Sequence, residues 1–181
     1  MMLKIVLPLL LMLTLTGCGS SFDPQTAADY YASLEAVTME ASVRADSGVT
    51  VDYELLFERC GGEDRVTILS PDSVAGVTAH LKNGAASLEY DDLAVETLLP
   101  GLHGFVPADV VSGLLDDLAG DVPDAWGLQG DELELTYSGE QNGVRTQKIV
   151  WLSADDLHLL GGELYLDDRL ILTVSIGTFV T

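Results

Sequence analysis

Hydrophobic and polar residues alternate along most of this 181-residue chain, and the alternation predicts β-strands. It begins at residues 37–44 and resumes at 49–58 after a turn at 46–48, which together predict a hairpin. Alternation of this kind indicates an antiparallel sheet with one covered face and one wet face. The further predicted strands span residues 65–69, 76–82, 85–90, 93–98, 132–137, 144–152, 157–160, 163–166 and 170–179, with a bulge or kink expected at Gly161-Gly162.

Two stretches follow helical spacing instead. Asp23-Pro24 is typical of a helix start, and the apolar residues that follow predict a helix over residues 24–35. A central helix is expected to open at Pro107 and to end at Gly120. Its apolar stripe consists of Val110, Val111, Leu114, Leu115 and Leu118.

The balance of elements predicts an α+β fold that is mostly β. About ten strands in one domain rarely remain a flat open sheet, so we expect a strongly curved antiparallel sheet. The N-terminal helix and the central helix would cover its concave face, because the apolar stripe of the central helix has to be buried somewhere.

The first residues form a separate pattern. Lys4 precedes an apolar run at residues 5–15, which is typical of a secretory signal peptide and is shorter than the roughly 20 residues of a spanning helix. Leu15-Thr16-Gly17-Cys18 resembles the lipobox of bacterial lipoproteins. The resemblance implies cleavage before Cys18 and a diacylglyceryl group on its thiol, with fatty acids such as palmitate in the lipid. We therefore expect a signal peptide at 1–17, a lipidated cysteine and tether at 18–23, and one domain at 24–181, anchored on the extracytoplasmic face of the cell membrane.

The chain is strongly acidic. It has 8 Lys and Arg residues against 29 Asp and Glu residues, for a formal net charge of −21. Such a surface repels nucleic acid and gains nothing from an anionic bilayer. Two interpretations remain, namely solubility of an exported protein or a basic partner.

Residues with catalytic or metal-binding chemistry do not form a recognisable motif. His80, His103 and His158 lie far apart in different predicted elements, without zinc-site spacing, and no nucleophile elbow or P-loop occurs. Cys60, left single if Cys18 is lipidated, is expected to be a buried small hydrophobe. The acidic pairs fit turns and solvated positions better than a calcium loop: Asp91-Asp92, Asp116-Asp117, Asp155-Asp156 and Asp167-Asp168. We expect no metal, no cofactor and no enzymatic activity.

The order of elements, with residues 70–77, Asn83-Gly84 and Leu88-Glu89-Tyr90, is similar to that of the LolA/LolB-like lipoprotein-carrier superfamily. The resemblance covers about residues 24–179 and implies an unclosed β-barrel whose helices form a lid over an apolar cavity. Members bind acyl chains or lipidated partners and catalyse nothing. The Arg-Pro segment and Phe-Arg-Trp cluster of the proteobacterial carriers are absent between Asp46 and Pro71, so transfer of lipoproteins between membranes is not implied.

Two functions follow from these patterns. The first is a membrane-anchored protein that binds a lipid or acyl chain in a cavity between sheet and helices. The second is a structural or interaction lipoprotein of the cell envelope with a packed core and a protein partner that the sequence does not identify. For the first, the candidate cavity residues are Met39, Tyr53, Leu55, Phe57, Val77, Leu88, Val110, Leu114, Leu115, Ile149 and Leu172.

Overall fold

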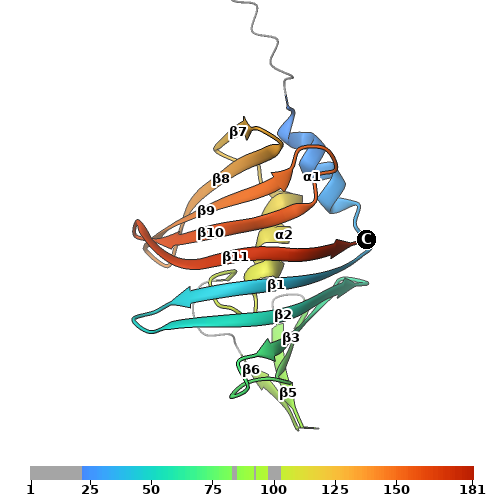
Figure 1. Ribbon diagram of the computed structural model, residues 1–181, viewed down its shortest axis with the longest axis vertical. Helices are drawn as coiled ribbons and strands as arrows, with labels where there is room; N and C mark the ends of the chain where they lie inside the picture. The colour runs from blue at the N-terminus through green and yellow to red at the C-terminus, as the bar shows by residue number, and fades with distance from the viewer. Residues whose placement is uncertain (1–21, 83–84, 92, 98–102) are drawn as a thin grey trace, which may run out of the picture.

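The computed structural model describes residues 22–82, 85–91, 93–97 and 103–181 (Figure 1). The predicted signal peptide, Cys18 and the Asn83-Gly84 turn lie outside the described residues. Within these ranges, no helix combines the length and apolar character that a membrane crossing would need. The helices and strands of the described residues all lie between Pro24 and Val180.

The described residues contain eleven strands that form a single sheet with antiparallel pairing (Figure 1). The strands are β1 (Ala36–Asp46), β2 (Thr50–Cys60), β3 (Glu63–Ser70), β4 (Thr78–Lys82), β5 (Ala85–Tyr90), β6 (Leu93–Thr97), β7 (Ala125–Gln129), β8 (Glu132–Gln141), β9 (Val144–Ser153), β10 (Leu159–Leu166) and β11 (Arg169–Val180). Their order is β6-β5-β4-β3-β2-β1-β11-β10-β9-β8-β7. The first and last strands of the chain thus pair at the centre, while β6 and β7 form the two edges of a sheet that does not close.

Helix α1 (Pro24–Ala32) begins where the sequence predicts. The Asp23 side chain accepts a hydrogen bond from the backbone N–H of Gln25 at 3.1 Å, which caps the helix. The helix ends three residues before the predicted position, because Ser33 caps its C-terminus. The backbone N–H of Ser33 donates to carbonyls of the last turn, and its hydroxyl donates to the Tyr30 carbonyl at 2.7 Å. Tyr31 is buried, and its hydroxyl donates to the Leu157 carbonyl at 2.6 Å, which fixes α1 to the sheet.

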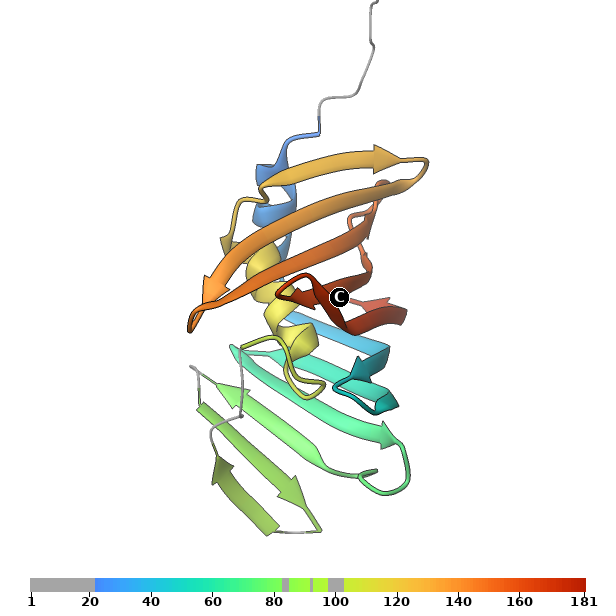
Figure 2. The same ribbon diagram turned by 90° about the vertical axis from the view of Figure 1, so that its left-hand side faces the viewer.

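Helix α2 (Val110–Gly120) links the two edges of the sheet and crosses its concave face (Figures 1 and 2). The prediction that Pro107 opens it is wrong by one turn, because residues 106–109 form a turn that precedes the helix. The Asp109 carboxylate holds that turn by accepting from the backbone N–H groups of Gly104 at 3.0 Å and Val106 at 3.1 Å. Only small residues fit where the helix touches this turn: a Cβ at Gly113 would lie 2.5 Å from the Gly104 Cα.

Three local features differ from the sequence analysis or refine it. The sequence did not reveal β7, which is short and fully exposed at the sheet edge. The predicted strands 157–160 and 163–166 merge into one strand, β10, which begins only at Leu159, and a register shift between Leu159 and Gly161 gives the expected irregularity. Cys60 is exposed rather than buried, because it is the last residue of β2 and falls out of phase with the buried Leu55 and Phe57.

Candidate functional site

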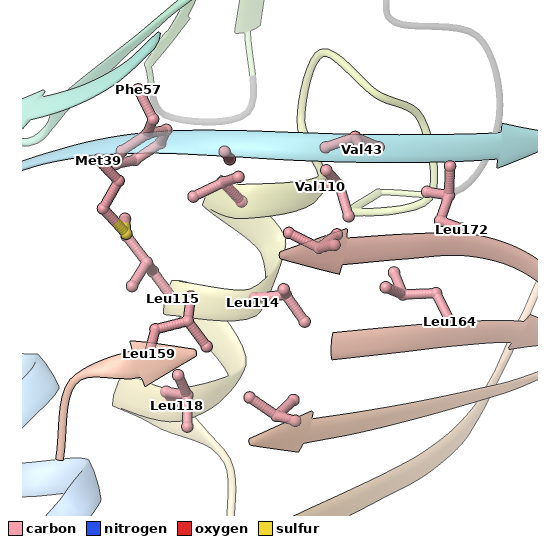
Figure 3. Close-up of a cluster of buried hydrophobic side chains, with 14 of the residues drawn as sticks. Met39, Val43, Phe57, Val110, Leu114, Leu115, Leu118, Leu159, Leu164 and Leu172 are labelled. Carbon is pink, nitrogen blue, oxygen red and sulfur yellow. The ribbon is translucent and has the colours of Figure 1, made fainter. Parts of the chain in front are cut away.

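The concave face around α2 is a packed apolar core (Figure 3). Seven of the candidate cavity residues are at most 2% exposed in it: Met39, Leu55, Phe57, Val110, Leu114, Leu115 and Leu172. Tyr53 and Leu88 are half-buried at its margin. Val77 precedes β4, and Ile149 points to the opposite face of β9, since its neighbours Lys148 and Val150 are the buried ones.

A pocket of about 1010 Å³ lies beside this core, on the side of α2 that faces β3 to β5. The end of α1, the start of β1 and the β2–β3 turn form its other walls. The candidate cavity residues are not among the described residues that line it. Its described lining consists of Tyr31, Ala32, Leu34, Glu35, Ala36, Arg59, Cys60, Gly61, Gly62, Asp64, Leu81, Lys82, Ala85, Ala86, His103, Asp109, Ser112, Asp116 and Ala119.

A charged network forms one wall of the pocket. Arg59 on β2 makes two hydrogen bonds with the Asp64 carboxylate on β3, from Nε at 2.6 Å and from Nη2 at 2.7 Å. The same Nη2 also donates to Asp116 on α2 at 2.8 Å. The hydroxyl of Ser112, one turn earlier on α2, donates to the second oxygen of Asp64. Because the side chains of Arg59 and Asp64 are only 18% and 7% exposed, this bidentate pair is largely withdrawn from water.

His103 extends the network toward solvent. Its Nδ1 lies 3.5 Å from Asp109, and its Nε2 lies 3.5 Å from Asp116. The pKa of the His103 imidazole is raised to about 10, first by the hydrogen bond with Asp109 and then by the one with Asp116. The pKa of Asp116 is lowered in turn, first by His103 and then by Arg59. The imidazolium therefore links the turn before α2 to the helix itself.

The opposite flank of α2 carries a second buried ion pair. Lys148 on β9 is 6% exposed, and its Nζ lies 2.6 Å from the Asp117 carboxylate and 5.2 Å from the centre of the Phe105 ring. Burial raises the pKa of Asp117, although Lys148 opposes that effect. Asp116 thus contacts Arg59 and His103 on one side of the helix, and Asp117 contacts Lys148 on the other. The described residues contain no cluster of three or more His, Cys, Asp or Glu that could hold a metal ion.

The charged wall of the pocket was not predicted, although the sequence contains a signal for it. Arg59 occupies the same alternation phase as Leu55 and Phe57, and Asp64 shares the phase of Val66, so each charge replaces an apolar residue on the covered face. A charged residue in the buried phase of a strand is rarely left unpaired. Arg59 and Asp64 lie one residue beyond the predicted strands 49–58 and 65–69, so extending the alternation by one residue in each would have indicated an internal ion pair.

Comparison with known proteins concerns the fold. No protein-family model matches the sequence, and no curated protein matches it. Among solved structures, an uncharacterized conserved protein from Thermus thermophilus has a TM-score of 0.54 at 10% identity, over 87% of this chain and 84% of its own. A LolA superfamily protein from Nitrosomonas europaea has a TM-score of 0.47 at 13% identity, over 88% and 93%. The lipoprotein LppX from Mycobacterium tuberculosis has a TM-score of 0.44 at 10% identity, over 86% and 91%.

Identities of this size show the fold and carry no statement about ligand or partner. The chain shares its fold with the Thermus thermophilus protein, and this fold is the unclosed, curved antiparallel sheet with helices on its concave face that the sequence predicted.

Proposed function

We propose that this chain is a membrane-anchored extracytoplasmic lipoprotein that binds a hydrophobic ligand, a lipid or an acyl chain, without catalysis. The observation that carries the proposal is the pocket of about 1010 Å³ between α1, α2 and strands β2 to β5. This volume is at the upper end of the range of about 300–1,000 Å³ in which ligand pockets usually fall. The pocket lies on the concave face, where the core around α2 stops.

The lining of the pocket suits an amphiphile. Apolar side chains such as Tyr31, Leu34 and Leu81 would contact the hydrocarbon part of the ligand. Arg59 and Asp64 satisfy each other's charges before any ligand binds, so this wall offers hydrogen-bonding groups without a strong net charge. We therefore expect a ligand with an apolar chain and a small polar head rather than a multiply charged molecule.

The anchor on Cys18 is part of the same proposal and rests on the lipobox sequence. Its test is the mass of the intact protein from a bacterial host. Loss of residues 1–17 together with a mass gain equal to a diacylglyceryl group is expected, and Cys18→Ser should prevent both changes. Retention of the unmodified N-terminus on the wild-type protein would refute the anchor and leave the pocket proposal to its own test.

A second function has support of its own. Seven candidate cavity residues, three of them on α2, are at most 2% exposed, so the centre of the concave face is filled as in a purely structural domain. An envelope interaction protein with this fold would use its acidic surface to dock a basic partner. Its binding would weaken with salt and would leave the pocket empty.

The distinguishing experiment measures uptake of a fluorescent acyl probe by residues 19–181. Ala32→Trp places a large side chain in the pocket wall at an exposed position of α1, so it should reduce uptake strongly. Gln25→Trp is the matched control, because Gln25 is also exposed on α1 and does not line the pocket. Thermal melts check that both variants fold. Equal uptake by the two variants would contradict binding in this pocket.

A further inference from the structure

Strand β7 exposes an apolar surface at one edge of the sheet. All five of its residues are exposed, and they include Trp126 at 51% and Leu128 at 55%. Val122, just before the strand, is 77% exposed. An exposed apolar edge strand is a liability that proteins usually cover, so this surface calls for a partner.

The surface continues the apolar face of the sheet. Trp126 is paired with Leu135 and Leu128 with Leu133, and both partners on β8 are 1% exposed. Directly opposed residues of an antiparallel pair point to the same side, so Trp126 and Leu128 belong to the concave face. The apolar residues of this face are therefore buried on β8 but exposed on β7.

The position of this edge indicates what covers it. Figures 1 and 2 both place β7 beside the N-terminal end of α1, at the same end of the long axis of the molecule. The described chain begins there, at Phe22, only four residues after Cys18. Four residues span at most about 14 Å when fully extended. A bilayer that holds Cys18 is therefore within reach of this end of the domain.

We infer that Val122, Trp126 and Leu128 form a membrane-contact surface that lies in the headgroup region of the bilayer to which Cys18 is anchored. The inference rests on the proposed lipid anchor and adds a second contact between the protein and the bilayer. Trp is enriched at membrane–water interfaces because its ring is apolar and its N–H is polar. The lipid anchor fixes the distance of the domain from the bilayer, and the contact surface would fix its orientation.

The charge around the surface sets its lipid preference. Asp121 and Asp124 flank Val122, and the chain as a whole is strongly acidic. Anionic lipids would therefore repel this end of the protein, and the contact would depend on apolar insertion alone. We expect the contact to be stronger on phosphatidylcholine vesicles than on vesicles that contain phosphatidylglycerol.

The test uses two proteins that differ in which tryptophan they keep. The chain from residue 18 carries Cys60→Ser, because Cys60 is exposed and would compete for the coupling reagent. Cys18 is coupled to a maleimide lipid in phosphatidylcholine vesicles with brominated acyl chains, so the test does not depend on natural lipidation. Trp151→Phe leaves Trp126 as the reporter, and Trp126→Phe leaves Trp151, which lies on β9 with its N–H bonded to Glu134.

Brominated lipid should quench Trp126 strongly and leave Trp151 nearly unchanged. Equal quenching of the two reporters would overturn the inference, while the natural anchor would still stand or fall by the mass measurement. Emission of Trp126 that is unaffected by lipid but shifts on addition of a second protein would also overturn it, in favour of a protein partner at this edge.

A pair of double variants measures the orientation directly. Trp126→Ser with Leu128→Ser removes the surface, and Leu93→Ser with Val95→Ser removes two apolar side chains of β6 that are even more exposed, at the opposite end of the molecule. Only the first double variant should increase the protease sensitivity of the vesicle-tethered protein near β7. Equal increases in both variants would contradict a membrane contact at this edge.

Discussion

Arg59→Met isolates the contribution of the charged pocket wall to the stability of the fold. Methionine has an unbranched side chain like that of arginine but carries no charge, so the substitution mainly removes the guanidinium. Three hydrogen bonds are lost, two to Asp64 and one to Asp116. Asp64, whose side chain is 7% exposed, would keep only the Ser112 hydroxyl as a side-chain partner among the described residues.

The structure sets the expected size of the effect. Breaking a buried ion pair by removing one partner costs about 3–5 kcal/mol, and the exposure of Arg59 places this pair at the lower end, about 3 kcal/mol. For a domain of this length, that loss should lower the melting temperature by about 6–12 °C. Urea unfolding at pH 7, followed by circular dichroism, gives the free energy of unfolding directly.

Arg44→Met provides the matched control. Arg44 also pairs with an aspartate on a neighbouring strand, Asp52 at 2.7 Å, but the two side chains are 66% and 65% exposed. An exposed pair is screened by water and salt, so its removal should change the free energy of unfolding far less. If Arg59→Met were no more destabilising than Arg44→Met, the network would not be the buried stabilising element described here.

The remaining predictions concern α2 and the histidine beside it. Leu114→Ala should cost about 2–5 kcal/mol of stability, measured by urea unfolding, and should leave uptake of the acyl probe unchanged, because the residue belongs to the core; altered uptake at unchanged stability would instead place the ligand among the core residues. Gly113→Ala should destabilise by about 1–3 kcal/mol because its methyl group would collide with Gly104, whereas Gly120→Ala, with open space around it, should be neutral or stabilising by up to about 1 kcal/mol; thermal melts that rank the two equally would refute the close contact. The raised pKa of His103 means that its stabilisation is complete below pH 6.5 and is lost as the pH rises toward 10, so His103→Gln should flatten the fall in stability over that window, and parallel pH profiles would contradict the link to the aspartates.

The sheet and the central helix were predictable because they are periodic. Strands such as β1 alternate between buried and exposed positions, and the apolar residues from Val110 to Leu118 follow helical spacing. Each pattern therefore indicates which face of its element is buried. The exact ends were harder to predict. Pro107 looked like a helix start, yet the Asp109 carboxylate holds the preceding turn through backbone contacts that the sequence pattern does not reveal.

The pocket could not be predicted in the same way. Arg59, Asp64 and Ser112 come from three elements, and only their arrangement in space creates the charged wall. The candidate cavity residues share an apolar character that is equally typical of a packed core and of a ligand cavity. Strand β7 could not be predicted for a different reason. All five of its residues are exposed, so they show no alternation between a buried and an exposed face.

The central claim is that the pocket beside α2 holds a hydrophobic ligand, and native mass spectrometry of residues 19–181, purified from a bacterial host without detergent, tests it most directly. The account predicts a bound species that organic extraction identifies as lipid, present on the wild-type protein and on Gln25→Trp and depleted on Ala32→Trp. A ligand-free mass for the wild-type protein, together with no uptake of an added acyl probe, would contradict the claim and favour an envelope protein that acts through protein partners.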